Sequence, residues 1–194
     1  IGAGIAGASA AFRLAEYGTV LLLEGESAPG YHTTGRSAAL FSERYRNPLI
    51  RGLAQASGEL LRNPPPGFGD AGLLTDRGLM IVGTASQHEA VRNQFTDEQM
   101  RTGIAEELSV AEACELCPVL RPDYLGSARL VPQAKDIDVN ALHQGFLRGL
   151  AHAGGQLVCN ARVQGLTHSG GVWQIETPAG DFQAGVIVNA AGAW

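Results

Sequence analysis

The sequence predicts an α/β fold, built around a parallel sheet that is covered by helices. Three observations predict this class. A glycine-rich turn of the form G-x-G-x-x-G occupies residues 2–7, an alanine-rich stretch and the apolar run 20–23 follow it directly, and a second apolar run occupies residues 186–188. Short continuous apolar runs are typical of parallel strands buried on both faces. With 45% apolar and 17% charged residues, the 194-residue chain can bury a sizeable core.

The first 24 residues carry the spacing of a dinucleotide-binding unit. Alanine favours a helix over residues 8–17, Gly18 is expected to end it, and Glu24 follows the strand 20–23. In this Rossmann-like arrangement the glycines allow a tight turn, a close approach of pyrophosphate and close packing of helix on strand. The helix N-terminus offers N–H groups to phosphates, and the acid accepts hydrogen bonds from ribose hydroxyls. The predicted binding residues are Gly2, Gly4, Ile5, Ala6, Gly7 and Glu24.

The motif alone leaves the identity of the dinucleotide open. An acid at position 24 disfavours a 2′-phosphate and hence NADP, whereas NAD and FAD share the same adenosine half. The following loop, residues 27–39, combines small residues, four hydroxyl side chains other than tyrosine, and Arg36. Such a loop suits contact with a polyanion, and a solvated surface loop is the alternative. A glycine-rich turn in an unrelated α/β domain is the corresponding alternative for residues 2–7.

Later elements follow from local patterns. Ser109 and Glu112 form a capping box before a helix, and Asp138 or Asn140 is expected to cap another. Helices are predicted within residues 40–66 (ended by prolines 64–66), at 89–99, 110–115 and 141–152, and strands at 73–83, 157–159, 172–175 and 182–189, with a hairpin turn at 178–181. The C-x-x-C at 114–117 lacks further zinc ligands at suitable spacing, so we interpret it as structural.

The composition excludes several classes of function. The net charge is −5 and no long basic cluster occurs, so we expect no nucleic-acid partner. No apolar run approaches the roughly 18 residues of a membrane span, and no secretory signal is evident. Three cysteines are a sparse set that fits a reduced compartment. We therefore expect a cytoplasmic enzyme, with peripheral attachment to a membrane left open.

Several blocks together carry a resemblance to a known family. Besides the glycine motif and Glu24, they are TTGRSAA at 33–39, NPP at 63–65, CPVLR at 117–121, DID at 136–138 with ALHQG at 141–145, and VNAAGAW at 188–194. In this order they resemble the flavin-dependent D-amino acid oxidase superfamily, and within it the bacterial D-arginine dehydrogenase and glycine oxidase-like enzymes. The resemblance implies FAD as the cofactor.

The same resemblance implies a domain organisation. Residues 1–75 and 138–194 would form two segments of a Rossmann-like FAD-binding domain, and residues 76–137 part of an α+β substrate domain. Because the chain starts inside the glycine turn and stops just after a strand, we expect a fragment of a longer protein that is inactive alone.

The resemblance also implies contacts for individual residues. The loop residues His32, Thr33, Thr34, Ser37, Ala38 and Ala39 would lie at the cofactor, the backbone of Val163 at the adenine, and Ala190 and Gly192 near the pyrophosphate. By pattern alone, Val163 reads equally as part of a core strand. No metal site is predicted. The family's carboxylate-binding arginine and tyrosine are expected in later sequence, so no catalytic residue is assigned.

The implied reaction is oxidation of a D-amino acid or a related amine. Hydride leaves Cα for flavin N5, and the imino acid formed is hydrolysed to a keto acid and ammonia; oxygen or a quinone accepts the electrons. Where D-arginine dehydrogenases carry a histidine and a glutamate, this chain has Leu40 and Leu79. Burying a guanidinium against leucine costs several kcal/mol, so we expect apolar or small substrates.

Three questions stay open at this level. Tyr45 would act as a lid over the substrate, or it is a packed helix tyrosine. An NAD-dependent dehydrogenase and a non-catalytic dinucleotide-binding fragment are the alternative functions. A flavin absorption spectrum and turnover of amines distinguish them.

Overall fold

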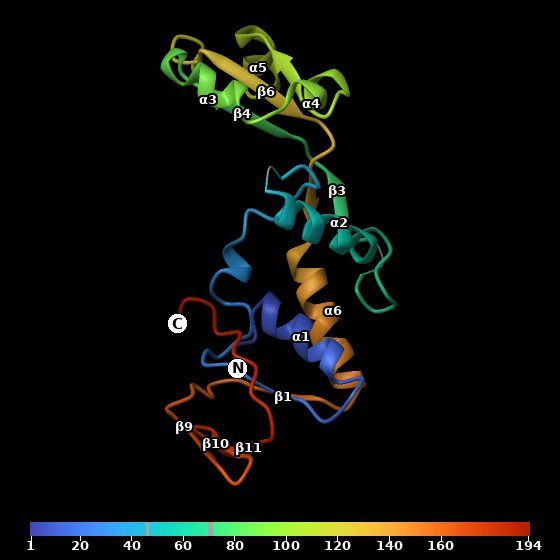
Figure 1. Cartoon of the computed structure of the whole chain (residues 1–194), viewed down its shortest axis with the longest axis vertical. Coiled ribbons are helices and arrows are strands. Elements are labelled where there is room, and N and C mark those ends of the chain that lie inside the picture. Colours follow the sequence, from blue (N-terminus) through green and yellow to red (C-terminus); the bar gives the residue numbers. More distant parts are fainter. Residues whose placement is uncertain (46, 70–71) are drawn as a thin grey trace. The chain divides into compact units, whose positions relative to one another are not determined.

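The computed structural model describes residues 1–45, 47–69 and 72–194 (Figure 1). The chain forms two compact units, each built from separate stretches of sequence. Unit 1 comprises residues 1–38, 64–73 and 138–194, and unit 2 comprises residues 39–63 and 74–137. Residues 39–63 therefore group with 74–137, whereas the sequence analysis assigned them to the first cofactor-binding segment. The functional assignment of domains 1–75, 76–137 and 138–194 stays a prediction.

Unit 1 contains the parallel sheet that the sequence predicted. Strand β1 (Leu21–Leu23) pairs in parallel with β8 (Gln156–Val158). Backbone hydrogen bonds extend this pairing, because Gly2 N–H donates to Leu23 O at 2.8 Å and Ala190 N–H donates to Ile1 O at 2.8 Å. The glycine turn thus begins in line with the sheet, next to β1.

Two helices pack together in unit 1, as Figure 1 shows for α1 (Ile5–Leu14) and α6 (Val139–His152). Asp138 caps α6 by accepting the N–H of Ala141 at 2.7 Å, which confirms one of the two predicted caps. Small residues on α1 allow the close approach, and the shared core consists of Ala3, Ala11, Leu22 and Leu150. The rings of Phe12, Phe68 and Phe146 form a second apolar contact between these elements.

An antiparallel sheet completes unit 1. Its strands are β9 (Gly165–Ser169), β10 (Val172–Thr177) and β11 (Gly180–Ala184), with β10 in the centre. The β10–β11 turn confirms the predicted hairpin. The predicted strand 182–189 is wrong beyond Ala184, where β11 ends. In the segment that follows, Ile187 packs on the core and Val186 is 79% exposed.

Unit 2 holds two three-stranded antiparallel sheets. One has the order β2 (Leu40–Phe41), β7 (Lys135–Ile137), β3 (Leu74–Asp76), and the other has the order β4 (Leu79–Gly83), β6 (Ser127–Val131), β5 (Glu106–Leu108). Its helices are α2 (Pro48–Arg62), α3 (His88–Arg92), α4 (Asp97–Arg101) and α5 (Val110–Leu116). Short 3-10 turns are η1 (Thr34–Arg36) in unit 1 and η2 (Ala85–Gln87) in unit 2. The capping box of Ser109 and Glu112 is confirmed at α5.

Three further predicted elements differ from the structure. The first helix ends at Leu14 rather than at residue 17, because i−3 bonds from Glu16 and Tyr17 tighten the chain there, and Gly18 is not in the left-handed region. The predicted helix 89–99 is two helices, because Thr96 caps a new one. The predicted strand 73–83 is split at Gly78, and its halves belong to different sheets.

Among the described residues, none of the helices has the length and apolarity needed to cross a membrane. The three cysteines are free thiols, and Cys117 is the C-cap residue of α5. The structural interpretation of the C-x-x-C stays a prediction.

Candidate functional site

The glycine turn is shaped by contacts that exclude side chains. Gly2 has φ +94°, and a Cβ there would lie 2.5 Å from Ala190 O. A Cβ on Gly7 would lie only 1.8 Å from Gly2 O. Since these neighbours are backbone atoms, they cannot move aside as a flexible side chain does. The glycines therefore fix the start of α1 directly against the turn, as the Rossmann-like spacing predicted.

The N-terminus of α1 presents backbone donors. Its N-cap residue, Gly4, has no side chain with which to cap the helix. The N–H of Ile5 donates to Thr34 Oγ1 at 2.9 Å. The N–H groups of Gly4 and Ala6 have no acceptor within hydrogen-bond distance among the described residues. Free N–H groups and the helix dipole together favour an anion at this position.

Glu24 lies at the end of β1, beside the same turn. Its Oε2 accepts the N–H of Ala3 at 2.8 Å, and its Oε1 accepts the N–H of Glu26 at 3.0 Å. Each carboxylate oxygen has a second lone pair, so the held carboxylate can still accept hydroxyl groups. Its charge also reaches Cys159, whose pKa is raised mainly by burial and further by Glu24.

The loop 27–38 is held to the rest of unit 1 by a small charged cluster. His32 Nε2 lies 3.0 Å from Glu26 Oε1, and Arg162 Nη2 lies 3.2 Å from the same oxygen. The hydrogen bond with His32 holds the pKa of Glu26 below its usual value, and the charges of His32 and Arg162 add to this effect. The ring of His32 also contacts the ring of Trp194, with centroids 4.8 Å apart.

All predicted cofactor-binding residues except Ala39 lie in unit 1. Thr33 precedes η1, Thr34 reaches α1, and Ser37 and Ala38 are exposed. Val163 packs against the core cluster of Leu23, Ala161 and Ile175, but it lies outside any strand, so its reading as part of a core strand is wrong. The N–H of Ala190 donates a hydrogen bond to Ile1 O, and Gly192 is exposed in the turn that follows.

The predicted substrate residues and Ala39 lie in unit 2. Leu40 and Leu79 pack against one core cluster, which consists of Ala105, Val131 and Ala134. Tyr45 precedes α2 and is 40% exposed, so its reading as a packed helix tyrosine is wrong. Ala39 has φ +57°, a strained backbone for a residue with a Cβ, and its carbonyl accepts the N–H of Ile137 at 2.8 Å.

One residue for which the sequence predicted no role, His143 of α6, contacts the glycine turn. His143 is 4% exposed, and its Nε2 is 2.9 Å from Ala3 O. A signal was available, since His143 falls on the apolar face of α6 with Leu142, Phe146 and Leu150. A histidine on a buried face needs a polar partner, but the pattern does not identify it.

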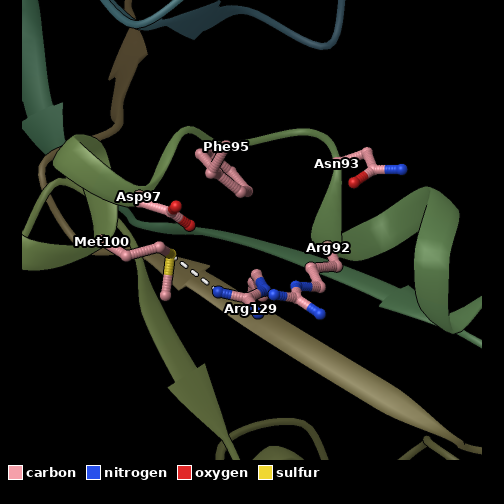
Figure 2. Close-up of a pocket in the computed structure, with 6 residues that line it drawn as sticks. All are labelled: Arg92, Asn93, Phe95, Asp97, Met100 and Arg129. Carbon is pink, nitrogen blue, oxygen red and sulfur yellow. Dashed lines mark hydrogen bonds between the residues drawn. The ribbon is translucent and has the colours of Figure 1, made fainter.

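A separate cavity of about 270 Å³ lies in unit 2 (Figure 2). Its wall includes Arg129, which is 7% exposed. Arg129 Nη1 donates to Met100 Sδ at 2.7 Å, and its Nη2 donates to Glu107 Oε2 at 3.2 Å. The lining residues are Arg92, Asn93, Phe95, Asp97, Met100 and Arg129. They include none of the predicted site residues.

Solved structures share this fold. Glycine oxidase from Geobacillus kaustophilus matches with a TM-score of 0.80 and 22% identity, over 100% of this chain and 54% of that one. Glycine oxidase from Bacillus cereus ATCC 14579 matches with a TM-score of 0.77 and 20% identity, over 100% and 56%. L-proline dehydrogenase from P. horikoshii matches with a TM-score of 0.76 and 21% identity, over 100% and 52%. The chain thus spans about half the length of these proteins.

A family model described as "DAO: FAD dependent oxidoreductase" matches residues 1–194. This match confirms the resemblance inferred from the sequence motifs. It also identifies FAD, rather than NAD, as the cofactor. By a match along its whole length, the chain belongs to the DAO family of FAD-dependent oxidoreductases.

Proposed function

We propose that the full-length protein oxidises a D-amino acid or a related amine with FAD as its cofactor. One observation carries the proposal. At the N-terminus of α1 the N–H groups of Gly4 and Ala6 have no acceptor among the described residues, and the carboxylate of Glu24, which accepts the N–H of Ala3, lies beside the same turn. Pyrophosphate and ribose are joined in the adenosine diphosphate half of FAD, and these two groups match the two features. The names of the similar structures, glycine oxidase among them, support an amino acid as substrate.

The chain's own residues would bind and orient the cofactor. The N–H groups of Gly4 and Ala6 would donate to phosphate oxygens, and Glu24 would accept the ribose hydroxyls. Thr34 already accepts the N–H of Ile5, so its own hydroxyl hydrogen remains available to a phosphate oxygen. The small residues Ser37 and Ala38 would permit close approach of the flavin ring.

FAD, when bound, supplies the acceptor for the hydride from the substrate Cα. Loss of a hydride from Cα, that is of two electrons and one proton, converts the neutral amine to an iminium ion. The iminium ion releases a second proton from nitrogen to give the imine, which water hydrolyses to a keto acid and ammonia. The protein's task is then to hold Cα next to the acceptor in the right orientation.

The side chains at positions 40 and 79 support a preference for apolar or small substrates. Leu40 and Leu79 are packed in an apolar cluster and offer no charge to a cationic side chain. A guanidinium buried beside them would be unpaired, at a cost of several kcal/mol. Tyr45, exposed ahead of α2, remains our candidate for a lid over the substrate.

Turnover assays on the purified full-length protein test the proposal. We expect a flavin absorption spectrum that bleaches anaerobically with apolar D-amino acids, and a lower kcat/KM with D-arginine. Each substrate should be paired with its L-enantiomer, because L-proline dehydrogenase is among the similar structures. Peroxide formation under air, compared with reduction of a quinone, identifies the electron acceptor. A preference for D-arginine contradicts the substrate proposal, and a bound flavin that no amine reduces contradicts the amine oxidation itself.

A further inference from the structure

His143 is buried where helix α6 meets the glycine turn. Its Nε2 lies 2.9 Å from Ala3 O, and the side chain is 4% exposed. A carbonyl oxygen can only accept, so Nε2 carries the hydrogen and donates it. The bond joins residues that are 140 positions apart in the sequence.

This bond fixes the orientation of the peptide that follows Ala3. In a planar trans peptide the C=O and the next N–H point in opposite directions, and the described chain has no cis peptide. With Ala3 O held toward α6, the N–H of Gly4 points away from α6. The N–H of Gly4 has no acceptor among the residues that the structure describes.

The peptide that precedes Ala3 is fixed as well. The N–H of Ala3 donates to Glu24 Oε2 at 2.8 Å, and Ala3 itself is fully buried. Ala3 is therefore clamped on both sides, by an acid from the end of β1 and by a histidine from α6. The only donor of Ala3, its N–H, is already used and its carbonyl is held by His143, whereas the N–H of Gly4 has no acceptor among the described residues.

The same imidazole supports the loop that carries Thr34. A Cβ on Gly30 would lie 3.0 Å from His143 Cε1 and 3.2 Å from its Nδ1, and Gly30 has φ +76°. Gly30 O accepts the N–H of Gly35, next to the Thr34 that bonds to Ile5. One buried ring thus touches both segments that face the N-terminus of α1.

We propose that His143 is a positioning residue that aims the Gly4 N–H at the pyrophosphate of the cofactor. The inference rests on the proposed FAD site and adds a requirement to it. The bond sets the direction of a phosphate-binding N–H, whereas the ribose is bound by Glu24. Loss of the bond is therefore expected to weaken binding of the pyrophosphate and to spare the adenosine.

The test uses apoprotein prepared from the full-length enzyme and its His143→Leu and His143→Gln variants. Leucine fills the volume without a donor, and the glutamine amide can place an N–H near the position of Nε2. The dissociation constants of FAD, ADP and adenosine are measured by calorimetry, with the thermal midpoint of each apoprotein. For His143→Leu we expect ADP and FAD to bind about tenfold more weakly, the factor that corresponds to about 1.4 kcal/mol. Adenosine should bind with a change below about twofold, and His143→Gln should recover most of the ADP affinity.

Each outcome bears on one statement. Unchanged ADP affinity in His143→Leu, or equal weakening of ADP and adenosine, overturns the positioning role. Failure of the wild-type apoprotein to bind FAD or ADP overturns the proposed function instead, together with this inference. If His143→Leu does not fold, His143→Asn replaces it: its shorter amide cannot reach Ala3 O, so equal ADP affinity in the Asn and Gln variants overturns the role.

Discussion

Among the described residues, each of the two compact units buries one basic side chain, and the two side chains are hydrogen-bonded differently. In unit 1, His143 donates to the backbone carbonyl of Ala3, a strong acceptor that is itself buried. In unit 2, Arg129 donates to the thioether of Met100, a weak acceptor, and to Glu107, whose side chain is 64% exposed. Burial alone therefore does not identify a functional group. A functional role is indicated by the group that the buried side chain orients.

The glycines show the same contrast between the units. A Cβ on Gly7 in unit 1 would meet backbone atoms at a distance that no Cβ can occupy, whereas a Cβ on Gly52, within α2, would meet no atom within 4 Å apart from the helix's own backbone and the chain neighbours. One glycine is required by tertiary contact and the other is not. Substitutions at matched positions in the two units test this difference.

The largest effect is expected for Gly7→Ala. The added Cβ would lie 1.8 Å from Gly2 O, so helix and turn must separate. We expect a loss of stability of about 3 kcal/mol or more and loss of bound flavin. Urea unfolding of the full-length protein, followed by fluorescence, measures both. The control Gly52→Ala should stabilise by about 0.5–1 kcal/mol, because alanine favours a helix interior. Equal effects of the two substitutions would show that the close packing of the turn is not needed.

A smaller effect is expected for Glu24→Gln. The carboxylate would be replaced by an amide of the same shape, with one acceptor oxygen instead of two. Because hydrogen bonds to a charged group contribute about 1.5–3 kcal/mol, we expect FAD to bind roughly 10- to 100-fold more weakly. Equilibrium dialysis measures this change. The control is Glu16→Gln, which removes an exposed acid that pairs with Arg13 on the surface, and its FAD affinity should equal that of the wild type.

In unit 2, Arg129→Met is expected to be neutral or stabilising by up to about 2 kcal/mol. Replacement of a poorly paired buried charge by an apolar side chain of similar size removes a desolvation cost. Glu107 is exposed enough to return to water. Chemical denaturation measures the change. A loss of more than about 1 kcal/mol would indicate that Arg129 is well satisfied in its cavity, and the contrast with His143 would disappear.

The smallest expected effect is on the stability of unit 1 at low pH. The pKa of Glu26 is lowered by its hydrogen bond with His32, so the folded protein binds this proton less tightly than the unfolded chain does. Glu26 therefore stabilises unit 1 above its ordinary pKa, and this contribution is lost as the pH falls through the lowered value. NMR titration of His32→Ala should show the pKa of Glu26 returning toward its usual value. Glu112 in unit 2, whose pKa Ser109 lowers, is the internal control and should not change.

The comparison also explains what sequence reasoning could reach. The glycine turn, β1 and Glu24 follow one another within 24 residues, so their spacing alone predicted the site. The capping box of Ser109 and Glu112 and the hairpin are local in the same way. The contact of His143 with Ala3 joins distant residues, and no periodicity identifies such a pair. The break between α3 and α4, and the grouping of residues 39–63 with unit 2, depend on tertiary packing that local patterns do not contain.

The pairing of β1 with β8 has a consequence for how the chain acquires its structure. Leu21 lies beside Gln156, so β1 has no described neighbour on that side until residues 156–158 have been synthesised. During translation the apolar segment 20–23 would stay exposed while the residues of unit 2 are synthesised and its strands pair with one another. Closing so long a loop is slow, and an unpaired strand edge invites contact with other chains.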